Sequence, residues 1–192
     1  MSTRIHLCGR VTVELDGRRM ERDLPGRQGR LLFVCLAAGR VRPATRAELL
    51  AALWPGDPPA RAEAALSSLL SKLRRTLGPH RLEGRGHVQL RLPQDAWVDL
   101  EASTAAVHRA EGAVTRKDWH AAWGPARLAQ HIAARGFLPG EEAPWIDERR
   151  SQVEAFYLRS LELAAQACLG IGGAKLVTGE RTARTLIAAD RG

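Results

Sequence analysis

Two spacings of apolar residues divide the chain and limit the folds open to it. At the start, apolar residues alternate with single residues, at Ile5, Leu7, Val11, Val13 and Leu15, and Asp16-Gly17 is a turn signal. From residue 27 onward, most apolar residues recur every three or four positions, as on one face of a helix. The sequence therefore predicts a small antiparallel N-terminal sheet, with a short strand near 18–20, followed by a mainly helical chain.

The first half of the chain continues with three predicted helices and a hairpin. Residues 27–38 form the first helix, which ends at Gly39. The second starts at Thr45, where Glu48 completes a capping box. The third covers residues 59–77 and is closed by Gly78-Pro79. Two short alternating runs within residues 81–92 then predict a β-hairpin with Arg85 at its tip.

From Asp99 the pattern is helical throughout. Helices are predicted at about 99–113, from about 118, at 145–169 and at 174–189, with a loop at 137–144. Gly124-Pro125 is expected to kink or split the second of these helices. Glu141-Glu142 is interpreted as favourable charge at the start of the next helix. Four helices with short links predict two packed antiparallel hairpins.

The positive charge lies in one half of the chain. The net charge is +8 over 192 residues; residues 1–98 hold 17 Lys and Arg against 9 Asp and Glu, and residues 99–192 hold 12 against 12. Uniform surface charge would not give this division. A polyanion-binding half joined to a neutral half would.

Composition excludes several classes of protein. An apolar fraction of 45% supports a core, and no apolar run approaches the roughly 18 residues that span a bilayer. The start of the chain lacks the shape of a signal peptide, and three scattered cysteines are typical of reduced thiols, so we expect a cytoplasmic protein. His6 and Cys8 share a strand face but have no third ligand, so neither a metal nor a cofactor is expected. No nucleotide-binding or hydrolase motif is present, and we do not expect an enzyme.

The third helix has one apolar and one basic face. Its leucines lie within about 60° of Leu66 on a helical wheel. The opposite face, called here the outer face, carries no acid; it comprises Arg61, Ala64, Ser68, Ser71, Lys72 and Arg75, flanked by Ser67 and Arg74. Such a face can be an ordinary solvated surface or one that enters a nucleic-acid groove. The hairpin tip also has two interpretations. Gly84 and Gly86 form an ordinary turn, or they leave Arg85 free to enter a minor groove.

Several stretches resemble a known family. GRVRPATRAELLAALWP, ALSSLLSKLRRTLGP and GRGHVQLRL resemble the winged-helix DNA-binding domain of OmpR-type regulators, as does the opening RIHLCGRVTVELDGR. The second half, including GFLPGEEAPWIDERR, resembles the tetratricopeptide-like bacterial transcriptional activation domain. Together they resemble the Streptomyces antibiotic regulatory protein (SARP) family over nearly the whole chain.

The resemblance implies an α+β winged helix-turn-helix domain at residues 1–98 and an all-α tetratricopeptide-like domain at 99–192. It implies an activator that binds direct repeats in promoter DNA as two copies and recruits RNA polymerase. The third helix would be the recognition helix and residues 81–92 the wing. Family domains usually continue for further helices after residue 190, which leaves two alternatives, a short member and a piece of a longer protein.

The predicted DNA-contacting residues have different roles. Lys72, with Ser68 and Ser71, is expected to touch base edges. Phosphate contacts are expected from Thr45, Arg46, Arg61, Arg74 and Arg75, and the remaining predicted contacts are Ser67, Arg85, Gly86 and His87. The family commonly has Gly-Tyr where this chain has His87-Val88, which removes an aromatic wing contact. The alternative function is a helical-repeat scaffold whose basic half binds RNA or acidic partners without sequence preference.

Overall fold

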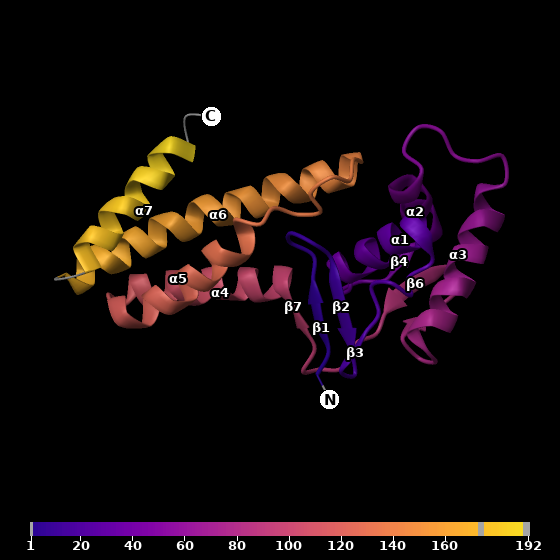
Figure 1. Ribbon diagram of the computed structural model, residues 1–192, viewed down its shortest axis with the longest axis horizontal. Helices are drawn as coiled ribbons and strands as arrows, with labels where there is room; N and C mark the ends of the chain where they lie inside the picture. Colours follow the sequence, from indigo (N-terminus) through magenta and orange to yellow (C-terminus); the bar gives the residue numbers. More distant parts are fainter. Residues whose placement is uncertain (1, 173–174, 190–192) are drawn as a thin grey trace. The chain divides into compact units, whose positions relative to one another are not determined.

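The computed structural model describes residues 2–172 and 175–189 and divides into two compact units (Figure 1). The first unit comprises residues 1–98 and 140–147, and the second comprises 99–139 and 148–192. Residues 140–147, which the sequence analysis places in the second domain, therefore belong with the first unit. Within the described ranges, no helix is long and apolar enough to cross a membrane.

The first unit begins with a four-stranded sheet. Its strands are β1 (Arg4–His6), β2 (Thr12–Leu15), β3 (Arg18–Arg19) and β7 (Trp97–Val98), in the order β3-β2-β1-β7. The alternation of the sequence predicts β1 to β3, which pair antiparallel, with Ile5 opposite Val13. Strand β7 was not predicted; it pairs parallel to β1, with Ile5 opposite Val98. A parallel partner 93 residues away leaves no local signal in the sequence.

Three helices and a second sheet complete this unit. The helices are α1 (Gly26–Ala38), α2 (Arg46–Leu53) and α3 (Ala62–Leu77), and the strands are β4 (Ala44–Thr45), β5 (Leu82–Glu83) and β6 (His87–Leu90). The sheet order is β4-β6-β5, so the predicted hairpin gains a third strand from the segment before α2. Helix α3 packs against α1, α2 and β5. The fully buried large side chains of this unit include Ile5, Leu32, Phe33, Leu49, Leu66, Leu70 and Leu73.

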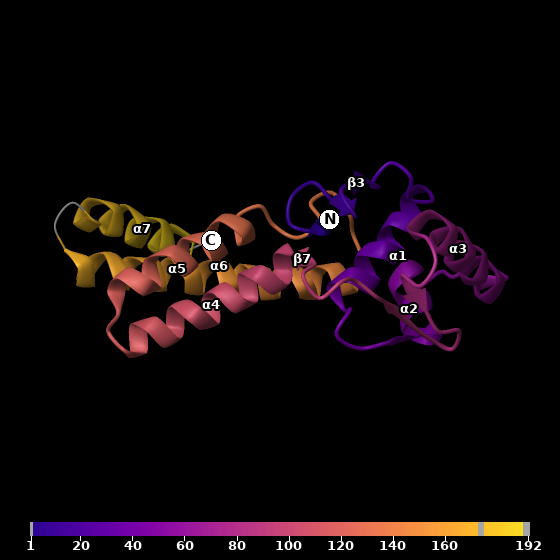
Figure 2. The same cartoon turned by 90° about the horizontal axis from the view of Figure 1, so that it is seen from below.

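The second unit is all-helical. Its elements are α4 (Asp99–Thr115), α5 (Trp119–Ala133), α6 (Pro144–Ile171), which begins in the first unit, and α7 (Lys175–Ala189) (Figure 2). Pro125 does not split α5, which runs on through it with Ala122 and Ala126 fully buried on either side. The core is rich in alanine, so the helices approach closely; it comprises Ala106, Val107, Ala110, Ala126, Ala129, Leu163 and Ala164. The predicted helix start at Ala174 lies outside the described residues.

The segment at 140–147 corrects one interpretation of the sequence. Glu141 is buried and does not decorate a helix N-terminus. Its carboxylate accepts hydrogen bonds from Arg27 Nε at 2.8 Å and Arg30 Nη2 at 2.9 Å, both on α1. Burial raises the pKa of Glu141, but the hydrogen bonds from Arg30 and Arg27 outweigh it, and the pKa lies below the ordinary value.

Candidate nucleic-acid interface

The outer face of α3 is open to solvent. Ser67, Ser68, Ser71, Lys72 and Arg75 are exposed, and Leu66, Leu70, Leu73 and Leu77 are buried on the opposite side. The side chains of Lys72 and Arg75, and of Arg61 just before the helix, have no hydrogen bond or ion pair within the described part of the chain. These cations therefore stay available to an anionic ligand.

Arg46, a predicted phosphate contact, is paired with other residues of the chain. Its guanidinium forms an ion pair with Glu63 at 2.6 Å and donates a hydrogen bond to Ser67 Oγ at 2.9 Å. The Arg46 side chain is only 25% exposed, whereas the Glu63 side chain is 63% exposed. Arg46 thus ties the start of α2 to the first turns of α3, and it engages Ser67 in the same contact. The four-residue spacing of Glu63 and Ser67 puts them on one helix face, so one guanidinium group reaches both.

Arg74 holds the predicted wing against α3. Its Nε donates to the carbonyl oxygen of Leu82 at 3.3 Å, and its Nη2 donates to the carbonyl oxygen of Gly84. Both acceptors lie at the start of the hairpin formed by β5 and β6. Arg74 adds positive charge to this surface, but its hydrogen bonds are intramolecular.

The hairpin tip requires glycine at one position. Gly84 has a φ of 85°, and a Cβ added there would lie 1.8 Å from the carbonyl oxygen of His87. A Cβ added at Gly86 would meet no atom within 4 Å. Arg85 and His87 are exposed, and Arg85 has no ion pair within the described residues. The tip therefore presents a cation on a narrow, tightly turned loop.

A third link joins the tip to α2. Strand β4 pairs with β6, with Thr45 opposite His87, and the backbone N–H of Arg46 donates to the carbonyl oxygen of Gly86 at 3.3 Å. Thr45 also caps α2, because its side chain accepts from the backbone N–H of Glu48 in the predicted capping box. The structure thus brings the helix start, α3 and the hairpin tip together in one unit.

The electrostatics at the start of α2 are dominated by Glu48. Arg42 Nη2 lies 2.8 Å from Glu48 Oε1, and the hydrogen bond from Arg42, followed by those from Thr45, lowers the pKa of Glu48 to about 2. Glu48 is therefore ionised at neutral pH and neutralises Arg42. Since Arg42 and Arg46 are both paired, the free cations of this surface are Arg61, Lys72, Arg75 and Arg85 among the predicted residues.

The arrangement is that of a winged-helix domain joined to a helical unit. No family model matches the chain. The chain is 29% identical over 168 residues to the regulatory protein AfsR of Streptomyces griseus, covering 82% of this chain and 16% of that protein. It is 29% identical over 184 residues to AfsR of Streptomyces coelicolor, covering 95% of this chain and 18% of that protein. The chain thus spans less than a fifth of the length of these relatives.

A solved structure has the same fold. The fold of Mycobacterium tuberculosis EmbR, determined in complex with a low-affinity phosphopeptide, matches with a TM-score of 0.78 at 18% identity, covering 99% of this chain and 57% of that one. The predicted fold class, a winged helix followed by an all-α domain, is confirmed. The predicted resemblance to SARP regulators is also confirmed by the AfsR relatives, which are regulatory proteins.

Proposed function

We propose that the first unit binds duplex DNA with sequence preference and that the chain acts as a transcriptional activator. The supporting observation is the outer face of α3, where exposed serines accompany Lys72 and Arg75 and no acid is present. Lys72 with Ser68 and Ser71 reads base edges, and Arg61 and Arg75 contact phosphates. Arg85 reaches a minor groove from the hairpin tip. Arg46 and Arg74 set the position of α3 and the hairpin through their intramolecular hydrogen bonds.

The second unit serves protein contact in this proposal. Its residues 99–139 and 148–192 hold 12 Lys and Arg against 9 Asp and Glu, whereas the first unit holds 17 against 12, so the second unit attracts a polyanion less strongly. Large apolar side chains are exposed at the end of α6 and on α7, among them Leu169, Leu176, Val177 and Ile187. Such side chains suit contact with protein. The resemblance to SARP activators assigns that contact to a second copy on DNA and to RNA polymerase.

Selection of duplexes from a random pool tests the DNA-binding proposal. The full chain is incubated with the pool, bound duplexes are amplified and sequenced, and the enriched sequence is footprinted. We expect a short enriched motif protected at two direct repeats. Equal retention of all sequences, or tighter binding to structured RNA than to any duplex, would favour the scaffold alternative.

Activation is tested on the enriched site in a purified transcription system. Leu176→Glu with Val177→Glu should abolish activation while a single site is still bound with unchanged affinity, because the change lies outside the DNA-binding unit. Gln166→Glu with His120→Glu adds two negative charges at exposed positions of the same unit and is the matched control. Full activation by the Leu176 and Val177 double variant would show that α7 makes no contact needed for it.

A further inference from the structure

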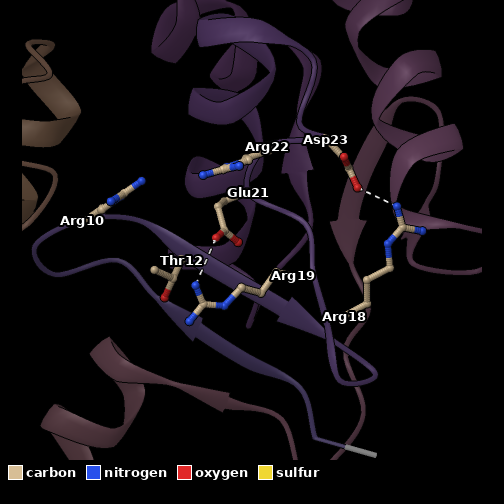
Figure 3. Close-up of a pocket in the computed structure, with 7 residues that line it drawn as sticks. All are labelled: Arg10, Thr12, Arg18, Arg19, Glu21, Arg22 and Asp23. Carbon is tan, nitrogen blue, oxygen red and sulfur yellow. Dashed lines mark hydrogen bonds and ion pairs between the residues drawn. The ribbon is translucent and has the colours of Figure 1, made fainter.

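A basic cavity lies on the first sheet, on elements that the proposed DNA contacts do not use. Its volume is about 480 Å³, and it is formed by Arg10, two residues before β2, by β2 and β3, and by the loop after β3 (Figure 3). The lining residues are Arg10, Thr12, Arg18, Arg19, Glu21, Arg22 and Asp23. Four arginines against two carboxylates leave a formal charge of +2 in one small cavity.

Two of the four arginines are already engaged. Arg18 Nη2 lies 2.8 Å from Asp23 Oδ2, and Arg19 Nη1 lies 4.0 Å from Glu21 Oε1, the outer limit for an ion pair. Arg10 and Arg22 have neither a hydrogen bond nor an ion pair within the described ranges, and Figure 3 shows both guanidinium groups without a partner. The uncompensated charge of the cavity is thus at Arg10 and Arg22.

Glu21 offsets this charge only in part, because its carboxylate is held by the backbone and makes no ion pair with Arg10 or Arg22. Its carboxylate accepts from the backbone N–H of Val13 at 3.4 Å, across the sheet. A hydrogen bond from its own backbone N–H lowers the pKa of Glu21 and, with the N–H of Val13 and the charges of Arg19 and Arg10, outweighs the opposing effect of burial. The carboxylate is therefore ionised and fixed, and an incoming ligand must be an anion that tolerates it.

The carboxylates of Glu21 and Asp23 make this cavity more suitable for one class of anion than for another. Guanidinium groups take carboxylates and phosphates as bidentate ligands. A continuous phosphate backbone would pass close to Glu21 and Asp23 and be repelled by both. A single carboxylate can enter between Arg10 and Arg22 with less repulsion, because it carries one charge and its neighbours in a peptide are adaptable. The outer face of α3, with no acid, has the opposite composition and suits the phosphate backbone.

We propose that this cavity is a docking site for an acidic segment of a protein partner, with an Asp or Glu carboxylate bound between Arg10 and Arg22. The site lies on β2, β3 and the loop after β3, and none of its lining residues is a proposed DNA contact. A partner bound there would therefore meet residues of the first unit other than those proposed to contact DNA.

Fluorescence anisotropy on the full chain tests the proposal. The probe is a labelled 12-residue peptide of alternating aspartate and serine, and its control has asparagine in place of aspartate. Arg10→Gln with Arg22→Gln should lower the affinity for the aspartate peptide by about tenfold or more, because charge-assisted hydrogen bonds are lost. Arg109→Gln with Arg116→Gln removes the same charge from exposed positions of the second unit and should change the affinity less than about twofold.

A second experiment measures the affinity of the same proteins for a 20-base-pair DNA duplex. The proposal expects both double variants to lower duplex affinity to the same small extent. Three results would overturn it: equal loss of peptide affinity in both variants, equal binding of the asparagine peptide, or a larger loss of duplex affinity in the Arg10 and Arg22 variant. The last result would assign the cavity to a DNA phosphate. Unfolding temperatures of the variants should stay close to that of the unchanged chain, since Arg10 and Arg22 have no hydrogen bond or ion pair to lose within the described ranges and Arg10 interacts with Glu21 only at longer range.

Discussion

The indole N–H of Trp145 donates a hydrogen bond to the carbonyl oxygen of Ala52 at 3.0 Å. Ala52 lies in the last turn of α2, where backbone carbonyls have no partner within the helix. Trp145 is separated from it by 93 residues, and Glu141 in the same segment binds Arg27 and Arg30 on α1. Residues 140–147 therefore stabilise the helices that carry α3, although they come from the far half of the chain.

Trp145→Phe tests this link. Phe keeps an aromatic ring, smaller than indole, and removes the N–H, so the carbonyl of Ala52 loses its donor; beyond the packing loss measured by the control below, the free energy of unfolding should fall by about 1 kcal/mol. Urea denaturation followed by circular dichroism measures it. Trp119→Phe is the control, because the N–H of Trp119 has no hydrogen bond within the described residues. An equal loss in the two variants would mean that packing alone, and not the hydrogen bond, accounts for the effect.

Glu141 should make stability depend on pH. Its pKa is lowered in the folded chain, so its contribution is present above the ordinary glutamate pKa and is lost as pH falls through the folded value. Glu141→Gln should lower the free energy of unfolding at neutral pH by about 1–3 kcal/mol and flatten its decline between about pH 5 and about pH 3. The exposed neighbour gives the control variant Glu142→Gln. Parallel pH profiles for the unchanged chain and Glu141→Gln would contradict the assignment.

The hairpin tip offers a matched pair of glycines. Gly84→Ala forces a side chain into left-handed backbone and against the carbonyl oxygen of His87, and it should cost about 2 kcal/mol or more of stability. Gly86→Ala meets no atom within 4 Å and should leave stability almost unchanged. Thermal unfolding distinguishes them. If duplex affinity falls in Gly84→Ala and is unchanged in Gly86→Ala at a temperature where both are folded, the hairpin geometry contributes to DNA binding.

Arg74 and Arg75 are adjacent but are expected to act differently. Arg75→Ala should weaken all duplexes about equally without changing the unfolding temperature, because Arg75 has no partner within the described residues. Arg74→Ala should weaken binding and also lower the unfolding temperature, because the hairpin loses two hydrogen bonds.

Lys72→Ala should instead cost about 1–3 kcal/mol of binding free energy at one base position and relax the sequence preference there. A uniform loss in Lys72→Ala would move Lys72 from base edges to phosphates.

Duplex binding should depend steeply on salt. If the first unit of one chain neutralises about 4–7 phosphates, the logarithm of the association constant for duplex DNA should fall with log[salt] at a slope of about −4 to −6. Arg42 and Arg46 are held by Glu48 and Glu63, so the shallower end of this range is the better expectation. Titrations at several salt concentrations give the slope. Arg75→Ala should reduce its magnitude by about 1, and a slope near zero would exclude phosphate contacts.

The sequence by itself predicted the elements and the faces they present. The alternation at residues 5–15 gave β1 and β2, the leucine spacing gave the buried and exposed sides of α3, and Thr45 with Glu48 gave the helix start. These features depend on residues that are close in sequence, because strand and helix repeats, capping and turn chemistry are local. The family resemblance rests on the same local patterns.

Only the tertiary structure decided which distant segments pair. The parallel contact of β7 with β1, the pairing of β4 with β6, and the packing of Trp145 on α2 join residues 42 to 93 positions apart. The partners of Arg46 and Arg74 were decided in the same way. A guanidinium group binds whichever carboxylate or carbonyl the fold brings within reach, and periodicity carries no information about that choice. The cavity of Arg10 and Arg22 likewise exists only because β2, β3 and the following loop meet around it.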